Sequence, residues 1–289
     1  MEIRKVQKTG DMHYLYLPTS WCKKNRINSG ANIALDQLDD GSLSVIPRIV
    51  ETPSKHLNIK LTEFNEDILK KVVIACYISP ASSFKIDPGK NADVTPILNQ
   101  KKIISLESVE LDKNMITCES TVSISDPASL LKTMVRKIKN LLTIMVKDYN
   151  LELINRYEEE IDRNNLLIEK SIVGFLTFSA SPKHKVIDLH YISLVSRELE
   201  ELSDHLVSMD KKETGFFSQA SEIIDLLDAI TGSSENINYI NSVQMIKKIE
   251  KMKKREAEYG YSKKRILYAF LTISEIILDW AVTKQVEAC

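Results

Sequence analysis

The C-terminal part of the chain has the periodicity of long helices, and this limits the folds that it can adopt. From Ser129 onward, apolar residues recur every three to four positions, with breaks at "SASPKHK", "DKKETG", "TGSSEN" and "EYGYSK". Segments of about 25 residues would extend about 38 Å as helices, and such lengths joined by short loops predict an antiparallel bundle. The six expected helices are residues 127–149, 151–178, 184–210, 216–231, 236–258 and 262–286.

Residues 1–48 have the pattern of short strands instead, in "IRKVQKTG", "HYLYLP", "NIALDQL" and "SLSVIP". Asp40-Gly41 between the last two predicts a hairpin. In "TSWCKKNRINSG", Thr19 or Ser20 would cap one or two helical turns and Gly30 would end the segment. A unit this small cannot bury its own sheet, so we expect a homodimer.

Residues 49–126 mix both periodicities. "HLNIKL" and "SFKID" predict strands, "NEDILKKVVIACYI" predicts an amphipathic helix, and "SLESVEL" with "NMITCESTVSI" predicts a closing hairpin. The expected fold class is therefore α+β multidomain. Its parts would be a small β domain at 1–48, an α+β module at 49–126 and an all-α bundle at 127–289.

The composition is that of a soluble protein, with 43% hydrophobic and 27% charged residues. Four scattered cysteines argue against a disulfide framework and fit a reducing cytosol. The most apolar long stretch, "ILYAFLTISEIILDWAV", is interrupted by Glu275 and Asp279, which favours a buried helix over a transmembrane segment. We expect a cytoplasmic location.

Acidic pairs at a spacing of four residues recur three times in the bundle region. They are Glu158 with Asp162, Glu200 with Asp204, and Glu275 with Asp279. Each pair lies on one helix face, so antiparallel neighbours could bring two pairs together. The simplest alternative is that these are solvated helix faces. Repetition in two aligned three-helix units, 127–210 and 216–286, favours a shared site.

Gathered carboxylates need a cation, because an uncompensated buried carboxylate costs several kcal/mol. Glu158, Asp162, Glu200 and Asp204 would suit magnesium, manganese, calcium, iron, or zinc if His205 adds a nitrogen. In the second unit a lysine replaces an acid, so Lys253 or Lys254 would neutralise Glu275 and Asp279. An ion pair is favoured there over a second metal.

Residues 127–289 resemble the PhoU family of phosphate-uptake regulators, through "EEEIDRNNLLIEKSIVGFL", "RELEELSDHLV" and, more weakly, "ISEIILDWA". The resemblance implies two three-helix repeats that bind divalent or trivalent metal through these acids. By position it assigns Glu158, Asp162, Glu200 and Asp204 as ligands, with Glu275 and Asp279 as a weaker set.

The N-terminal stretches "IRKVQKTG", "YLPTSW", "CKKNRINSGANIAL" and "DDGSLSVIP" resemble the AbrB/SpoVT swapped-hairpin DNA-binding domain. This implies DNA contacts from basic residues of the first strand and of the segment after the leucine-proline pair. The combination with a PhoU-like bundle matches an archaeal-type arrangement. The alternative is that these basic residues only keep a dimerisation domain soluble. The implied contacts are Arg4, Lys5, Lys23, Lys24 and Arg26.

Together the two resemblances imply a transcription regulator of phosphate homeostasis genes that binds double-stranded operator DNA. The rival hypothesis is an adaptor that contacts a phosphate transporter or a sensor kinase and does not bind DNA. An antitoxin-like DNA binder is a weaker third hypothesis. "DPGKNAD" lacks the residues of a phosphate loop and the histidines lack metalloprotease spacing, so no enzyme class is favoured.

Overall fold

The structure is a computed structural model. It describes residues 3–37, 41–47, 56–62, 65–89, 109–112, 115–119, 126–178 and 184–288. Contacts within the chain divide it into two units, Met1–Pro53 and a larger unit of Ser54–Ser179 with Lys183–Cys289. Both strands and helices are present, which agrees with an α+β multidomain chain.

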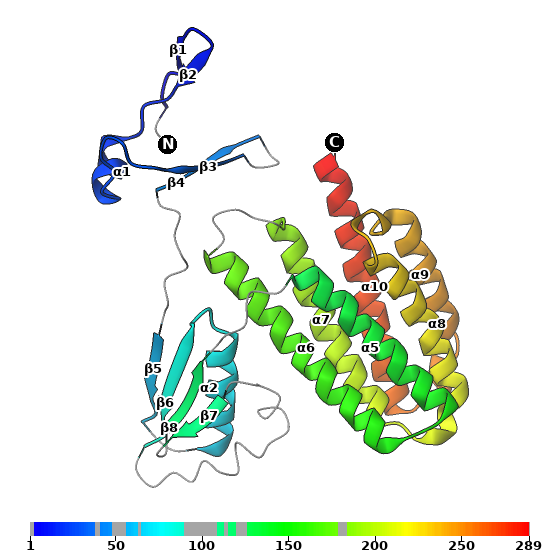
Figure 1. The fold of residues 1–289 in the computed structure, drawn as a ribbon. Helices are drawn as coiled ribbons and strands as arrows, with labels where there is room; N and C mark the ends of the chain where they lie inside the picture. The colour runs from blue at the N-terminus through cyan, green and yellow to red at the C-terminus, as the bar shows by residue number, and fades with distance from the viewer. Residues whose placement is uncertain are drawn as a thin grey trace. The chain divides into compact units, whose positions relative to one another are not determined.

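The first unit contains two antiparallel hairpins and one short helix (Figure 1). β1 (Gln7–Thr9) pairs with β2 (Met12–Tyr14), and Gly10 takes a positive φ of 62° in the turn between them. β3 (Ala34–Gln37) pairs with β4 (Leu43–Ile46), so the predicted pairing around Asp40-Gly41 is confirmed by the strands, although residues 38–40 lie outside the described part.

The short helix α1 (Thr19–Lys24) lies where it was predicted, but its ends differ from the prediction. Pro18 is the N-cap residue and no side chain caps the helix, so the predicted cap at Thr19 or Ser20 is wrong. The helix ends at Asn25, followed by Arg26 in the left-handed region with φ of 55°, and not at Gly30.

The described side chains of the first unit do not form a core. None of the described side chains between Ile3 and Pro47 is buried. Apolar side chains from both hairpins and from the segments around them are exposed instead, which is unusual for residues of this kind. They are Ile3, Val6, Met12, Tyr14, Leu15, Tyr16, Leu35 and Leu43.

The larger unit begins with a four-stranded sheet in the order β5-β6-β8-β7. β5 (His56–Lys60) is parallel to β6 (Ser83–Asp87), and β8 (Met115–Glu119) is antiparallel to both β6 and β7 (Val109–Asp112). The predicted hairpin of β7 and β8 is therefore confirmed, with residues 113–114 of its turn outside the described part.

Helix α2 (Glu66–Ile78) joins the two parallel strands and covers one face of this sheet (Figure 1). Asn65 caps it, accepting hydrogen bonds from the backbone of Asp67 and Ile68. Its buried apolar residues form one cluster with residues of β6 and β8 and with partly buried leucines of the long helix α6 (Leu151–Phe178). The cluster includes Leu69, Val73, Phe84, Ile86, Ile116, Leu166 and Leu167.

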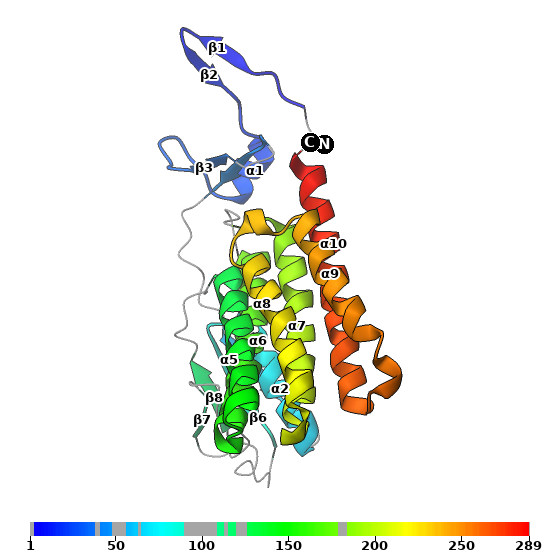
Figure 2. The ribbon, with the colours of Figure 1, turned by 90° about the vertical axis from the view of Figure 1, so that its right-hand side faces the viewer.

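Six long helices complete the larger unit and confirm the predicted helical segments to within a few residues. They pack in a closed order, in which α5 contacts α6, α6 contacts α7, α7 contacts α10, α10 contacts α9, α9 contacts α8, and α8 contacts α5 (Figure 2). The helices are α5 (Pro127–Lys147), α6 (Leu151–Phe178), α7 (Val186–Val207), α8 (Thr214–Thr231), α9 (Tyr239–Lys253) and α10 (Tyr261–Ala288).

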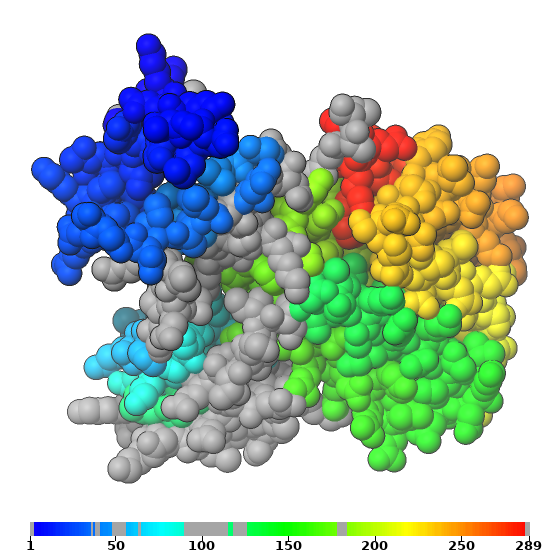
Figure 3. All heavy atoms as spheres, turned by 45° about the horizontal axis from the view of Figure 1, so that its top comes forward, coloured from blue at the N-terminus to red at the C-terminus, as the bar shows by residue number. Residues whose placement is uncertain are grey.

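The bundle has a continuous apolar core to which every helix contributes, including the fully buried Leu141, Phe217 and Phe270. In the space-filling view the green atoms of α5 abut the yellow atoms of α8, as expected for helices that pack along their length (Figure 3). A hydrogen bond also connects α7 to α10, because the indole Nε1 of Trp280 donates a hydrogen bond to Asp188 Oδ1 at 2.6 Å.

Helix α10 is the one helix of the described residues that is long and apolar enough to cross a membrane by length and composition. Its span from Tyr261 to Val286 has a mean hydropathy of 1.6, and half of the most apolar window is buried inside the bundle. Ile273, Ile277 and Trp280 on this helix are core residues. A buried core helix passes the same test of length and composition.

Candidate functional site

Three of the predicted acidic residues come together between α6 and α7. One ligand oxygen from each of Asp162, Glu200 and Asp204 lies within 4.8 Å of the others. Asp162 is only 7% exposed, Glu200 is half-buried and Asp204 is exposed. The cluster therefore extends from the edge of the core to the surface.

The helical period explains why the acids lie at this boundary. On α7, Leu199, Leu202 and Leu206 face the core. Glu200 and Asp204 lie about 100° to 160° around the helix from these leucines, which places both acids outside the core face. On α6, Ile161 occupies the core face and Asp162 follows it. The acids of both helices thus meet along the line where α6 and α7 touch.

A cavity of about 540 Å³ adjoins the cluster. Its lining is mostly polar and comes from both helices: Asn165, Glu169, Leu194, Arg197, Glu198, Glu200, Glu201 and Asp204. Burial raises the pKa of Glu198, and the nearby charges of Arg265 and Arg197 only partly offset this effect. A negative charge on Glu198 is therefore costly because of burial, and the neighbouring acids are not the cause of this shift.

Asn165 adds a further oxygen to the same cavity. It follows Asp162 by three positions, so the two side chains lie on one face of α6. Its Oδ1 atom is buried, and no described residue donates a hydrogen bond to it. Three carboxylates and an amide oxygen form a donor set that suits a hard cation such as Mg²⁺, Mn²⁺ or Ca²⁺.

Glu158 is not part of this cluster, so the structure assembles three of the four predicted ligands. The reason lies in the antiparallel packing of the two helices. Glu158 lies one turn before Asp162 on α6. Because α7 runs in the opposite direction, this turn of α6 lies beside the last turn of α7, which ends at Val207, and not beside Glu200 and Asp204. A four-carboxylate cluster would need a different register.

His205 faces away from the three acids, towards α10. Its Nε2 accepts a hydrogen bond from Arg265 Nε at 3.3 Å, and its ring packs edge-on against Tyr261. The Arg265 guanidinium also pairs with Glu201. In this arrangement His205 links α7 to α10, and the nitrogen ligand expected for zinc is not supplied.

The predicted neutralisation of Glu275 and Asp279 by Lys253 or Lys254 is wrong. Both acids are exposed, and Lys253 pairs with Glu250 at 3.6 Å. α9 and α10 are antiparallel, with the Ser242 hydroxyl near the carbonyl of Ile277. Lys253, eleven residues beyond Ser242, therefore lies about 16 Å further along the helix axis and cannot reach these acids.

The five basic residues predicted to contact DNA are all exposed on the first unit. Lys23 and Lys24 occupy the last turn of α1, Arg26 lies just beyond the C-cap residue Asn25, and Arg4 and Lys5 precede β1. Two lysines at a helix C-terminus also interact favourably with the helix dipole. Their positions therefore fit both a nucleic-acid contact and a local structural role.

Two features of the bundle were missed from the sequence. Asn165 lacked a signal, because a single asparagine in a helix has no distinctive spacing. The lysines of "KKIEKMKKR" did have a signal, a dense run of positive charge, but we interpreted it only as the source of a partner for Glu275 and Asp279.

No family model matches the chain, and no curated protein or solved structure was found to be similar to it.

Proposed function

We propose that the protein is a dimeric, cytoplasmic DNA-binding regulator of phosphate-uptake genes, built from an AbrB/SpoVT-like N-terminal domain and a PhoU-like bundle of two three-helix repeats. The observation that carries the proposal is the state of the first unit. It has exposed basic side chains and exposed apolar side chains, with no buried residue among those described. In this proposal the role is binding, and the chain is not an enzyme.

Dimerisation would supply a core for the first unit, since none of its described side chains is buried. Exposed Tyr14, Leu35 and Leu43 from the two hairpins would be buried against a second copy. Burying such side chains contributes about 1.5–3 kcal/mol each when it is complete. Two copies would also double the number of lysines and arginines that face a DNA duplex, and these groups supply the salt-dependent part of DNA affinity.

The test is capture of genomic fragments by the purified protein at physiological salt, followed by sequencing of the bound fragments. We expect a few promoters to be enriched, those of phosphate-transport genes among them. Lys23→Ala/Lys24→Ala should lose selective binding, whereas Lys211→Ala/Lys212→Ala, which changes two exposed lysines outside the first unit, should not. Equal binding by both variants would remove the assigned contacts.

The acidic site would serve as the sensory element. We propose that Asp162, Glu200 and Asp204 hold a divalent or trivalent ion, with Asn165 as a further oxygen ligand. Magnesium, manganese or iron suit oxygen donors better than zinc does, because His205 points elsewhere. Metal content of the purified protein should fall towards zero in Asp162→Asn/Asp204→Asn and stay unchanged in Asp279→Asn.

The alternative function is an adaptor that regulates a phosphate transporter or a sensor kinase through protein contacts. Exposed Glu275 and Asp279 on α10, and the charged faces of the bundle, would be its contact surfaces. Binding to all genomic fragments or to none, together with retention of a defined transporter subunit on the immobilised protein, would favour this function over DNA binding.

A further inference from the structure

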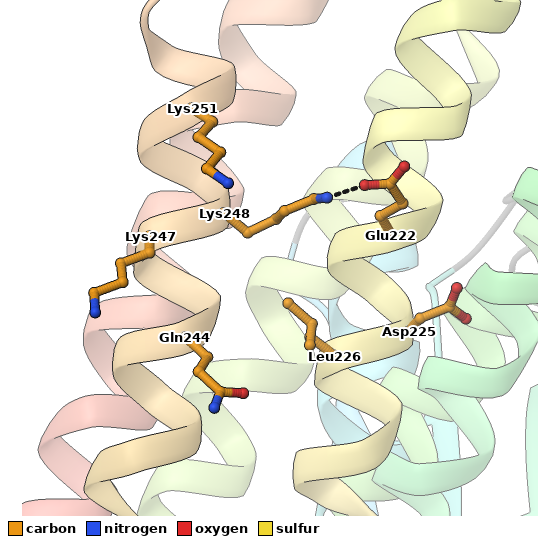
Figure 4. Close-up of a pocket in the computed structure, with 7 residues that line it drawn as sticks. All are labelled: Glu222, Asp225, Leu226, Gln244, Lys247, Lys248 and Lys251. Atoms are coloured by element: carbon orange, nitrogen blue, oxygen red, sulfur yellow. Dashed lines mark ion pairs between the residues drawn. The ribbon is translucent and has the colours of Figure 1, made fainter.

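A shallow groove runs between α8 and α9, on helices that the acidic site does not use. Its larger part has a volume of about 460 Å³ and is lined by Glu222, Asp225, Leu226, Gln244, Lys247, Lys248 and Lys251 (Figure 4). A second part of about 250 Å³ shares Glu222, Lys248 and Lys251 and adds Gln219, Ile223 and Met252. The shared residues make the two parts one groove.

The two walls of the groove differ in charge. The α8 wall carries acids, but these are already balanced. Asp225 pairs with Lys139 of α5 at 2.7 Å, and Glu222 pairs with Lys248 across the groove (Figure 4). The acids of α8 therefore leave no charge that the lysines of α9 would still have to neutralise.

The α9 wall carries an excess of positive charge. Lys247 and Lys251 are exposed, and within the described part of the chain no carboxylate lies within ion-pair distance of either. Lys254 continues the row at the end of the helix. Residues at i, i+4 and i+7 emerge from one face of a helix, so Lys247, Lys251 and Lys254 form a stripe about 10 Å long. The ammonium group of Lys251 points towards α8, and that of Lys247 points to the other side of α9 (Figure 4).

Between the walls the floor is apolar. Leu226 lies in the larger part, and the buried side chains of Ile223 and Met252 line the smaller one. A compact polyphosphate would fit poorly, because its oxygens need polar partners on every side and the floor of the groove is apolar. The ligand that matches all three surfaces has carboxylates along one edge and apolar side chains along the next.

We propose that this groove binds an acidic amphipathic helix of a partner protein. Carboxylates of the partner at i, i+4 and i+7 would pair with Lys247, Lys251 and Lys254, and its apolar side chains would lie on Leu226. A helix laid along a groove between two helices is a common mode of peptide recognition. The proposal is independent of DNA binding by the first unit.

The test uses the full-length protein and a fluorescein-labelled synthetic helical peptide with glutamates at i, i+4 and i+7 and leucines on the adjoining face. We expect binding by fluorescence anisotropy, weakened by added salt. Lys247→Glu/Lys251→Glu should weaken it at least about ten-fold, because two exposed ion pairs become repulsions. Gln244→Glu, which adds one negative charge to the groove, should weaken it in the same direction.

The matched control is Lys211→Glu/Lys212→Glu, which makes the same change of charge on exposed lysines outside the groove. It should bind the peptide as the wild type does. The second control is a peptide with glutamine in place of each glutamate, which should bind at least about ten-fold more weakly.

Three outcomes would overturn the proposal. The first is equal affinity for the glutamate and glutamine peptides, and the second is an equal loss in the groove variant and in the control variant. The third is the finding that Lys247→Glu/Lys251→Glu weakens the binding of duplex DNA as much as it weakens the binding of the peptide. That result would make the stripe a nucleic-acid contact.

Discussion

Neutralising Asp162 should have opposite consequences with and without metal. The oxygens of Asp162, Glu200 and Asp204 lie no more than 4.8 Å apart. Two unit charges at that separation repel by about 3 kcal/mol at an effective dielectric constant of 20 and by about 1 kcal/mol in water. Asp204 is exposed, and Asp162 and Glu200 also make other interactions, so the lower figure applies.

Asp162→Asn keeps the shape of the side chain and removes two of the three repulsions. In a chelator the variant should therefore be more stable than the wild type by about 1–2 kcal/mol. This corresponds to a rise in Tm of about 2–8 °C, since 1 kcal/mol shifts the Tm of a unit this size by about 2–4 °C.

With metal at about a hundred times its dissociation constant the order should reverse. The wild type should gain about 2.7 kcal/mol over its own value in chelator, while the variant, lacking one ligand charge, should gain much less. Thermal unfolding with and without Mg²⁺ or Mn²⁺ measures both the stability difference in chelator and the gain in stability that metal gives to each protein. The control is Asp279→Asn, an exposed acid at the aligned position of α10, which should leave the metal response unchanged.

Two results would refute this reasoning. One is an Asp162→Asn variant that is less stable than the wild type in chelator, because the carboxylate would then be stabilising without an ion. The other is an equal gain of wild type and variant on addition of metal, because the ion would then bind elsewhere.

Three further predictions concern the bundle. Trp280→Phe should lower the free energy of unfolding by about 1.5–3 kcal/mol in urea, because the buried indole loses its hydrogen bond to the Asp188 carboxylate; in an Asp188→Ala background the same change should cost much less. For Asp126, burial opposes ionisation, but the Ser129 hydroxyl, the charge of His184 and backbone N–H groups outweigh it and lower the pKa of this carboxyl. A lowered pKa means that the charged form stabilises the fold above the usual value of about 4, so Asp126→Asn should be destabilising at neutral pH, with a difference that shrinks as the pH falls below 4. Burial raises the pKa of Glu198, so Glu198→Gln should stabilise the protein at neutral pH, and this gain should fade as the pH falls through the usual range of a glutamate.

The helices could be predicted from the sequence because their signals are local. A period of 3.6 and breaks rich in glycine, serine and lysine define α5 to α10 without any knowledge of their neighbours. The cap of α1 shows the limit. Thr19 and Ser20 are good capping residues, but Pro18 already has the extended backbone of an N-cap, with ψ of 128°, so Thr19 is already the first residue inside the helix and cannot be its cap.

The acidic site was predicted only in part, because helix register is not a local property. The pairs on α6 and α7 were visible in the sequence, yet the alignment of the two helices decides that Asp162 and not Glu158 meets Glu200 and Asp204. In α10, the apolar residues around Glu275 and Asp279 predict a buried helix, but they do not show which face of the helix the two acids take. Those neighbours lie on other faces of the helix, and Glu275 and Asp279 share their exposed face with Tyr268 and Val282.

If the exposed apolar hairpins of the first unit are buried against a second copy, as proposed, the folding of this unit is a reaction between chains. A unit that obtains its core from a second copy has a stability that depends on protein concentration. On the proposed dimer, the amount of folded N-terminal unit would rise with the square of the concentration when the protein is scarce. DNA binding by such a dimeric regulator would then increase more than two-fold when the amount of protein in the cell doubles.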